Sequence, residues 1–308
     1  MEFFLNKIKY KDPDFLVVGL NKSGSYWLAA MLDAHPEINC FPTLPGGKSG
    51  VGEPHIFDVL GSIDEDGGAQ FRKSFTETRD GYFADLVPYL DKVSRNELYD
   101  MFRERYSQWC DLFRKKRLVG EKTQEYIFYL DIIDYFYPEI KKICIIRDSK
   151  DRLVAFYFNQ VRKGREAASK KIPDEFITSF VERVKKEYKI LLDYPKEIYC
   201  YTYESMIQDS KNALTGVLKF LGAVVSEKIL AEMIRAGSFE KLTALDAGSS
   251  DSSRKPGEEL STSHYRKGVA GDWKNYLDDQ QAELVNSKLG ELEKKMFKKY
   301  NLALKPIF

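Results

Sequence analysis

Several features that would point to other classes of protein are scarce or absent in this chain of 308 residues. The four cysteines are scattered without Cys-x-x-Cys spacing, which disfavours a disulfide framework and a metal site. No apolar run reaches the roughly 18 residues of a membrane span. Charged residues interrupt the N-terminus too early for a signal peptide. The composition therefore predicts a cytoplasmic protein without a metal ion or a membrane partner.

Charge of one sign is also lacking, because 48 lysines and arginines nearly balance 47 aspartates and glutamates. Proteins that bind nucleic acids usually carry a clear basic excess on one face. We therefore expect no nucleic-acid partner. The composition gives no indication of the oligomeric state.

Apolar strand patterns alternate with helical patterns along the chain, which predicts a parallel sheet flanked by helices. The expected strands are 15–19, 117–121, 142–147 and 198–203. The expected helices are 23–35, 94–116, 126–137, 149–163, 174–193, 208–221, 226–236 and 278–299. We predict one α/β domain over residues 1–308, with a P-loop-like nucleotide-binding core. The polar, aperiodic composition from residue 246 onward predicts a mobile lid at 246–270.

Residues 15–27, Phe-Leu-Val-Val-Gly-Leu-Asn-Lys-Ser-Gly-Ser-Tyr-Trp, contain a short apolar strand, a turn of small residues with one lysine, and the start of a helix. The N–H groups of a helix N-terminus and the charge of Lys22 together suit a phosphate group. A Walker A loop requires glycine directly before its lysine, whereas Asn21 stands there. Gly47-Lys48-Ser49 lacks the first glycine of that motif. A P-loop kinase is therefore disfavoured.

Two later segments carry similar chemistry. The apolar run that starts at residue 142 ends in Arg147 and a turn, and residues 265–275 read Tyr-Arg-Lys-Gly-Val-Ala-Gly-Asp-Trp-Lys-Asn. With the Lys22 turn, they resemble the sulfotransferases that use 3′-phosphoadenosine 5′-phosphosulfate (PAPS). The last segment matches that family's Arg-Lys-Gly-x-x-Gly-Asp-Trp-Lys-Asn at every fixed position. The resemblance runs from Phe15 to Asn275 and implies an enzyme that releases adenosine 3′,5′-bisphosphate.

The resemblance also implies a set of nucleotide-binding residues. The 5′-phosphosulfate would be held by the turn and first helical residues, Lys22, Ser23, Gly24, Ser25 and Tyr26. The adenine would contact Trp27, Tyr203 and the pair Ser238 and Phe239. The 3′-phosphate would be neutralised by Arg147, Arg266 and Lys267, with Gly268 in the same loop.

Catalysis would need a cation at the leaving oxygen and a base for the acceptor. Lys22 suits the first role. The cytosolic branch of the family uses a histidine after Lys-Thr as its base, but Gln124 follows Lys122-Thr123 here, and an amide cannot take a proton. The segment Glu53-Pro54-His55-Ile56-Phe57-Asp58 resembles the catalytic segment of the heparan sulfate and bacterial branch. That likeness makes Glu53 the expected base, with His55 as the alternative, and places Lys122 in the active site.

Two departures from the family pattern stand out. Ala155 occupies the position of a serine that binds the 3′-phosphate, and Tyr26 replaces a small hydroxyl residue, so that either the turn is reshaped or Tyr26 faces the acceptor. A nucleotide-binding protein with impaired catalysis is therefore an alternative. The acidic residues of segment 53–66 favour a neutral or cationic small-molecule acceptor, such as a hydroxyl or amine of a secondary metabolite.

Overall fold

The strands lie side by side in one parallel sheet, in a computed structural model that describes residues 10–41, 56–61, 63, 84–112, 114–169, 171–247, 253–260 and 263–302. Their order across the sheet is β2-β3-β1-β4-β5. Their bounds are β1 Phe15–Val17, β2 Ile38–Phe41, β3 Leu118–Lys122, β4 Lys141–Ile146 and β5 Tyr199–Thr202. This arrangement confirms the predicted α/β fold with a central parallel sheet.

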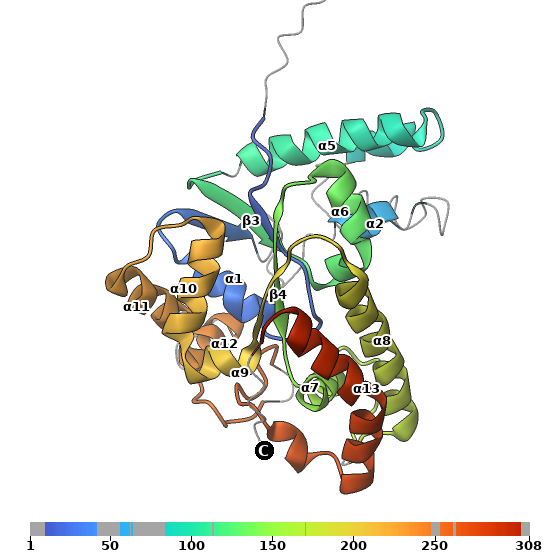
Figure 1. Cartoon of the computed structure of the whole chain (residues 1–308), viewed down its shortest axis with the longest axis vertical. Coiled ribbons are helices and arrows are strands. Elements are labelled where there is room, and N and C mark those ends of the chain that lie inside the picture. The colour runs from blue at the N-terminus through green and yellow to red at the C-terminus, as the bar shows by residue number, and fades with distance from the viewer. Residues whose placement is uncertain are drawn as a thin grey trace, which may run out of the picture.

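Helices connect these strands and cover both faces of the sheet (Figure 1). Before β4 they are α1 Ser25–Asp33, α2 Ile56–Gly61, the 3-10 helix η1 Ala84–Tyr89, α5 Arg95–Leu112, the 3-10 helix η2 Gln124–Tyr129 and α6 Leu130–Phe136. After β4 they are α7 Ser149–Arg162, α8 Asp174–Asp193, α9 Tyr203–Gln208, α10 Ser210–Leu221, α11 Glu227–Ala236, α12 Phe239–Ala247, the 3-10 helix η4 Asp272–Asn275 and α13 Asp279–Lys299.

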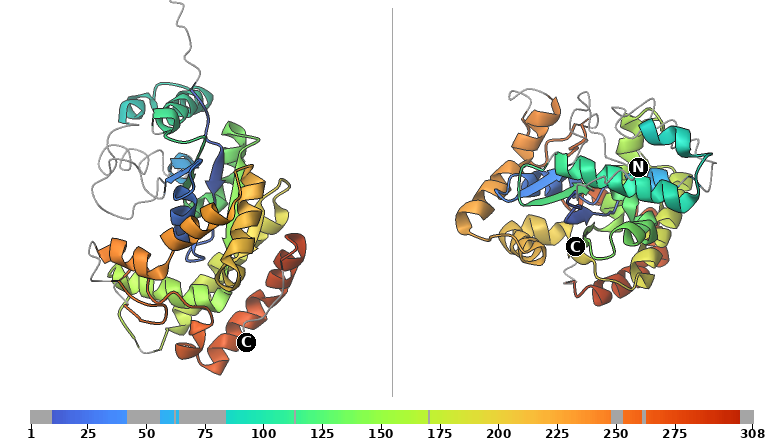
Figure 2. Two further views of the ribbon diagram at one scale, coloured as in Figure 1. Left: turned by 90° about the vertical axis from the view of Figure 1, so that its left-hand side faces the viewer. Right: turned by 90° about the horizontal axis from the view of Figure 1, so that it is seen from above.

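The core has two halves because side chains alternate between the faces of each strand. Leu16 belongs to a cluster with residues of α5, α6, α7, α8 and α13, whereas Phe15 and Val17 pack with residues of α1, α10 and α11. Figure 2 shows these two groups of helices on opposite sides of the strands. Strands buried on both faces read as the near-continuous apolar runs that identified them in the sequence.

Several elements differ from the sequence expectations, and the helices α2, η1, α9, α12 and η4 were not predicted. Strand β2 was not predicted, because the polar Asn39 interrupts a run of only four residues; its side-chain oxygen accepts a 2.8 Å hydrogen bond from the Lys115 N–H. The stretch expected as one helix at 126–137 begins as the 3-10 helix η2. The helix expected at 208–221 begins at Ser210, after Asp209, whose carboxylate accepts from the Asn212 N–H.

The order of the strands reverses its direction between β1 and β4. The chain leaves β1 towards β2 and β3, and leaves β4 in the opposite direction towards β5. In parallel sheets, ligands bind at such a reversal, beyond the carboxyl ends of the strands. The turn with Lys22 follows β1 and Arg147 follows β4, so the fold brings both to this edge of the sheet.

A buried ion pair ties the first turn to the helices behind it. Arg152 in α7 and Glu187 in α8 are both fully buried, and 2.6 Å separates Arg152 Nη2 from a Glu187 carboxylate oxygen. Arg152 Nε also donates to the carbonyl of Asn21, the residue before Lys22, at 2.9 Å. The guanidinium therefore fixes one end of the turn against the core.

Glu187→Leu should lower the free energy of unfolding by about 3–5 kcal/mol, because it leaves the Arg152 guanidinium buried without its counter-ion. Arg152→Met should cost less, since Glu187 keeps its 3.0 Å hydrogen bond from Arg183. Urea titration followed by circular dichroism measures both. The matched control is Glu182→Leu, an exposed residue of the same helix. If Glu187→Leu unfolds at the same urea concentration as this control, the ion pair does not support the fold.

Candidate active site

The turn after β1 has a backbone that only certain residues accept. Lys22 and Gly24 both have positive φ angles, 61° and 100°. A Cβ atom at Gly24 would lie 2.8 Å from Cδ2 of the Tyr203 ring, so a larger residue would collide there. The buried Ser23 hydroxyl donates to the Leu20 carbonyl and closes the turn. Helix α1 begins at Ser25, and the N–H groups of its first turn have no partner within the helix.

Two cations from neighbouring strands, Arg147 and Lys122, adjoin this turn. Arg147 Nη1 donates to the Lys22 carbonyl at 3.3 Å, and the guanidinium carbon lies 4.2 Å from the centre of the Tyr203 ring. Arg147 Nε is buried and has no hydrogen-bond partner among the described residues. Lys122, at the end of β3, is fully buried, with Nζ 2.9 Å from the centre of the Tyr26 ring. Tyr26 therefore points out of the backbone turn, towards Lys122.

The electrostatics of Lys22 show that this site suits an anion. Burial is the main cause that lowers its pKa from 10.5 to about 7. The charges that act most strongly on it are all positive, those of Arg162, Lys122, Arg147 and Lys163. A bound anion would favour the charged amine and raise this pKa again.

Aromatic side chains expected to contact the nucleotide lie next to the same turn. The ring centres of Trp27 and Tyr203 are 5.5 Å apart in an edge-to-face contact. A Cβ at Gly237 would lie 2.8 Å from Trp27 Nε1, and a Cβ at Gly268 would lie 2.4 Å from the Phe239 ring. Ser238 stands between Gly237 and Phe239, and its hydroxyl accepts from the Lys241 N–H. The fold therefore brings these predicted residues together.

The C-terminal loop docks on the start of α7. Asp151 accepts hydrogen bonds from the N–H groups of Gly271, at 2.6 Å, and Trp273, at 3.0 Å. Arg147 Nη2 donates to the carbonyl of Val269 at 3.2 Å. Arg147 therefore bridges the turn after β1 and the C-terminal loop.

Arg266 and Lys267, which are expected to bind the 3′-phosphate, form ion pairs within their own segment. Arg266 contacts Asp272 and Glu259, and Lys267 Nζ lies 2.7 Å from an Asp272 oxygen. To bind a phosphate, Arg266 and Lys267 would have to release these carboxylates, or bind the phosphate while they remain paired with them. Their contact with the nucleotide stays a prediction, as does the mobility of the segment at 246–270.

Both candidates for the base, Glu53 and His55, lie outside the described residues, so their assignment stays a prediction. The adjoining helix α2 is firmly held. The Ile56 N–H donates to the Tyr126 hydroxyl at 3.0 Å, and that hydroxyl donates to the buried Glu121 carboxylate at 2.7 Å. Glu121 directly precedes Lys122, so the end of β3 is linked to α2 through Tyr126 and to the start of α1 through the contact of Lys122 with Tyr26.

Other groups bear on the departure at Ala155 in α7. Ser149, Lys150 and Arg152 are the residues that could compensate for the missing hydroxyl. All three are engaged elsewhere: Ser149 bonds to Tyr188 and Glu293, Lys150 to Asn286, and Arg152 to Glu187. Three residues near Lys22 were not placed in the site by sequence reasoning, namely Arg162, Lys163 and His264. The only signal for His264 was its position beside the C-terminal motif.

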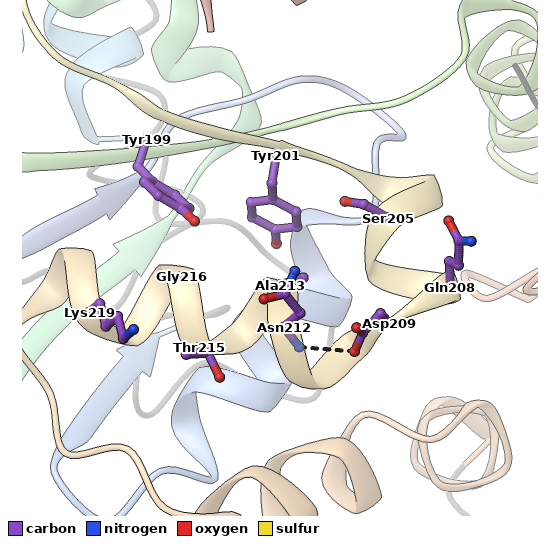
Figure 3. A pocket seen from close by; sticks show the side chains of 10 residues that line it. All are labelled: Tyr199, Tyr201, Ser205, Gln208, Asp209, Asn212, Ala213, Thr215, Gly216 and Lys219. Carbon is purple, nitrogen blue, oxygen red and sulfur yellow. Dashed lines mark hydrogen bonds between the residues drawn. The ribbon is translucent and has the colours of Figure 1, made fainter. Parts of the chain in front are cut away.

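A pocket of about 680 Å³ lies elsewhere, between β5 and helices α9 and α10 (Figure 3). Tyr199 and Tyr201 project from the strand towards α10, and none of the lining residues belongs to the predicted site. This pocket is therefore separate from the site formed by Lys22, Lys122 and Arg147, which we call the cation site.

Comparisons with known proteins agree with the geometry. The family model described as "Sulfotransferase domain" matches residues 12–297. Flavonol 3-sulfotransferase of Flaveria bidentis is 31% identical over 49% of this chain and 55% of its own length. Sulfotransferase 1 family member D1 of Rattus norvegicus is 29% identical over 47% and 52%. The chain thus spans about half the length of the curated relatives it matches.

Solved structures of low sequence identity share the fold. A mouse sulfotransferase complexed with PAP is 19% identical, with a TM-score of 0.53 over 94% of this chain and 87% of its own. A sulfotransferase from Alicyclobacillus acidocaldarius is 18% identical, with a TM-score of 0.51 over 95% and 97%. No helix in the described part of the chain is long and apolar enough to cross a membrane.

Lys22→Met should raise the melting temperature of the free protein, and more at pH 6 than at pH 9. The lowered pKa means that folding opposes the charge on Lys22. This penalty is complete below about pH 7 and shrinks as the pH rises towards 10.5, the ordinary pKa. Thermal unfolding at both pH values tests this, with the exposed Lys228→Met as control. Equal shifts at the two pH values would contradict the lowered pKa.

Proposed function

Because the chain belongs to the sulfotransferase domain family, we propose that it transfers the sulfuryl group of PAPS to a hydroxyl or amine of a small-molecule acceptor. The observation that carries this proposal is the gathering of Lys22, Lys122 and Arg147 around a turn at the carboxyl edge of the sheet. Positive charge buried next to free N–H groups of a helix start favours a phosphate ligand. The unpartnered Nε of Arg147 offers a further donor to such an anion.

The residues fit the two charged ends of this nucleotide. The turn from Ser23 to Tyr26 and Lys22 would bind the 5′-phosphosulfate, where Lys22 stabilises the charge that develops on the leaving oxygen. Arg147, helped by Arg266 and Lys267, would bind the 3′-phosphate, and Lys122 would face the transferring group. The edge of the Trp27 and Tyr203 pair offers a surface for the adenine, next to Phe239 and Gly268.

The proton of the acceptor needs a base, and we assign this role to Glu53, with His55 as the alternative. The support is the likeness of segment 53–58 to the heparan sulfate and bacterial branch, together with Gln124 at the histidine position of the cytosolic branch. The anchoring of Ile56 through Tyr126 to Glu121 supports a fixed position for the chain directly after His55.

The proposed class of acceptor is based on the charge of one segment and on the names of two relatives. The acidic residues of segment 53–66 favour a neutral or cationic molecule, for instance a secondary metabolite. The relative named flavonol 3-sulfotransferase supports a hydroxyl as the receiving group. A relative named cytosolic sulfotransferase 3 supports a cytoplasmic location. We also propose that the protein acts without a nucleic-acid partner and without a membrane partner.

One other function has a specific observation in its favour. Ala155 removes a hydroxyl from the place where the family binds the 3′-phosphate, which favours a nucleotide-binding protein with impaired catalysis. Such a protein would bind the nucleotide but transfer no sulfuryl group. A P-loop kinase is less well supported, because Asn21 and not glycine stands directly before Lys22.

The protein should bind adenosine 3′,5′-bisphosphate more tightly than 5′-AMP, because the 3′-phosphate pairs with Arg147. Arg147→Gln should reduce the ratio of the two affinities by about 10- to 150-fold, which corresponds to the free energy of one hydrogen bond to a charged group. Calorimetric titration of both nucleotides measures it. The matched control is Arg235→Gln, an exposed arginine of α11. Equal affinities for the two nucleotides in the unchanged protein would refute the 3′-phosphate site.

Glu53→Gln should lower kcat by about 10²–10⁴, because it removes the proton-accepting carboxylate, while nucleotide affinity stays nearly unchanged. The measurement follows transfer of labelled sulfate from PAPS to a panel of phenols, alcohols and amines. His55→Asn should cost less. Loss of activity in His55→Asn together with a nearly active Glu53→Gln would make His55 the base. Tight nucleotide binding without transfer in the unchanged protein would favour the impaired alternative.

A further inference from the structure

His264 reaches the cation site from the far end of the chain. Its ring meets the Tyr26 ring edge-on, with 4.5 Å between the ring centres, and the Lys122 amine lies 2.9 Å from the centre of the same Tyr26 ring. The backbone around it is well held, because the His264 N–H donates to Asp246 at 3.0 Å and Arg254 Nη2 donates to the next carbonyl, that of Tyr265. The imidazole is thus placed beside the predicted site of sulfuryl transfer.

The charges that face His264 keep its imidazole neutral. Burial is the main cause that lowers its pKa to about 2, followed by the positive charges of Lys22, Lys122, Arg162 and Lys163. These groups come from the turn after β1, the end of β3 and the end of α7. At physiological pH the ring therefore carries one N–H and one free nitrogen lone pair.

The neutral imidazole of His264 provides a hydrogen-bond acceptor beside lysine and arginine side chains. Lysine and arginine side chains can only donate hydrogen bonds, whereas a neutral imidazole can also accept one. The imidazole of His264 makes no hydrogen bond with any residue that the structure describes, and the rings of Tyr26 and Tyr265 lie edge-on to it. Its lone pair is therefore available to a ligand that carries a hydroxyl hydrogen.

We propose that His264 is a positioning residue for the acceptor, whose hydroxyl hydrogen it binds so that the hydroxyl oxygen lies beside Lys22 and Lys122. This inference rests on the proposed sulfuryl transfer and narrows it. The four surrounding cations oppose a positively charged acceptor, so a neutral hydroxyl compound is favoured over a cationic amine. His264 holds this hydrogen while the acceptor docks. For transfer, the O–H bond turns from His264 to the base, which takes the proton as the hydroxyl oxygen bonds to sulfur and adenosine 3′,5′-bisphosphate leaves.

Nitrogen NMR of the whole chain labelled at histidine tests the hydrogen bond without requiring turnover. The chain has three histidines, so the His264 signals are those lost in His264→Gln. With adenosine 3′,5′-bisphosphate present, 2-naphthol should shift the signal of the unprotonated ring nitrogen. The ether 2-methoxynaphthalene, which has no hydroxyl hydrogen, should not. Equal shifts with both probes, or none with either up to their solubility limits, would overturn the assignment.

Kinetics then separate positioning from proton transfer. His264→Phe keeps the ring contact with Tyr26 but should raise the KM for 2-naphthol about three- to tenfold, the range of one neutral hydrogen bond. His264→Gln, which retains an acceptor oxygen, should recover part of this loss, and the neighbouring Tyr265→Phe should leave KM unchanged. Equal inactivity of His264→Phe and His264→Gln at unchanged KM would make His264 a base and overturn the proposal.

The failure of the wider proposal would look different. If the unchanged protein releases no adenosine 3′,5′-bisphosphate from PAPS with 2-naphthol, yet naphthol alone shifts the His264 signal, sulfuryl transfer fails while the hydrogen bond stands. If transfer proceeds and the His264 signal and the KM of His264→Phe do not respond, the hydrogen bond fails while sulfuryl transfer stands.

Discussion

The crowding of positive charge at the carboxyl edge of the sheet is the constraint on which the site depends. Lys22 and Arg147 follow β1 and β4, and Lys122 is the last residue of β3, the other neighbour of β1. A parallel sheet brings the ends of such strands to one edge. Burial and mutual repulsion oppose the charge on Lys22, whose pKa falls to about 7. The site is therefore less stable without an anion than with one, which is a common property of binding sites.

Helix α7 holds this unfavourable arrangement in place. Within its first turn, Asp151 accepts the N–H groups of the C-terminal loop and Arg152 bonds to the carbonyl before Lys22. The burial of Arg152 is possible because Glu187 lies against it from α8. The same helix ends at Arg162, which adds to the positive charge around Lys22 and His264. A single helix thus links the core, the phosphate turn and the C-terminal loop.

Local sequence patterns were sufficient for the features that depend on neighbouring residues. The apolar runs of β1, β3, β4 and β5 predicted buried strands, and the spacing around Lys22 predicted a turn before a helix. The strand β2 escaped because it is short and carries Asn39. The helix break at Asp209 escaped as well, because a capping side chain and a solvated surface residue look alike in sequence.

Contacts between distant segments could not be predicted in this way. The ion pairs of Arg266 and Lys267 with Asp272 lie inside a motif whose residues the resemblance assigned to the nucleotide. The approach of His264 to Tyr26 joins residues from opposite ends of the chain. Such contacts depend on how the C-terminal loop docks against α7, and no spacing in the sequence encodes that docking.

A crystal structure of the whole chain with adenosine 3′,5′-bisphosphate tests the central claim, that the edge between β1 and β4 is a site for a nucleotide with two phosphate groups. We predict the 5′-phosphate within hydrogen-bonding distance of Lys22 and the N–H groups at the start of α1, and the 3′-phosphate against Arg147. A nucleotide bound elsewhere, for example in the pocket beside β5 (Figure 3), with Arg147 still bonded to the Lys22 and Val269 carbonyls, would contradict the account.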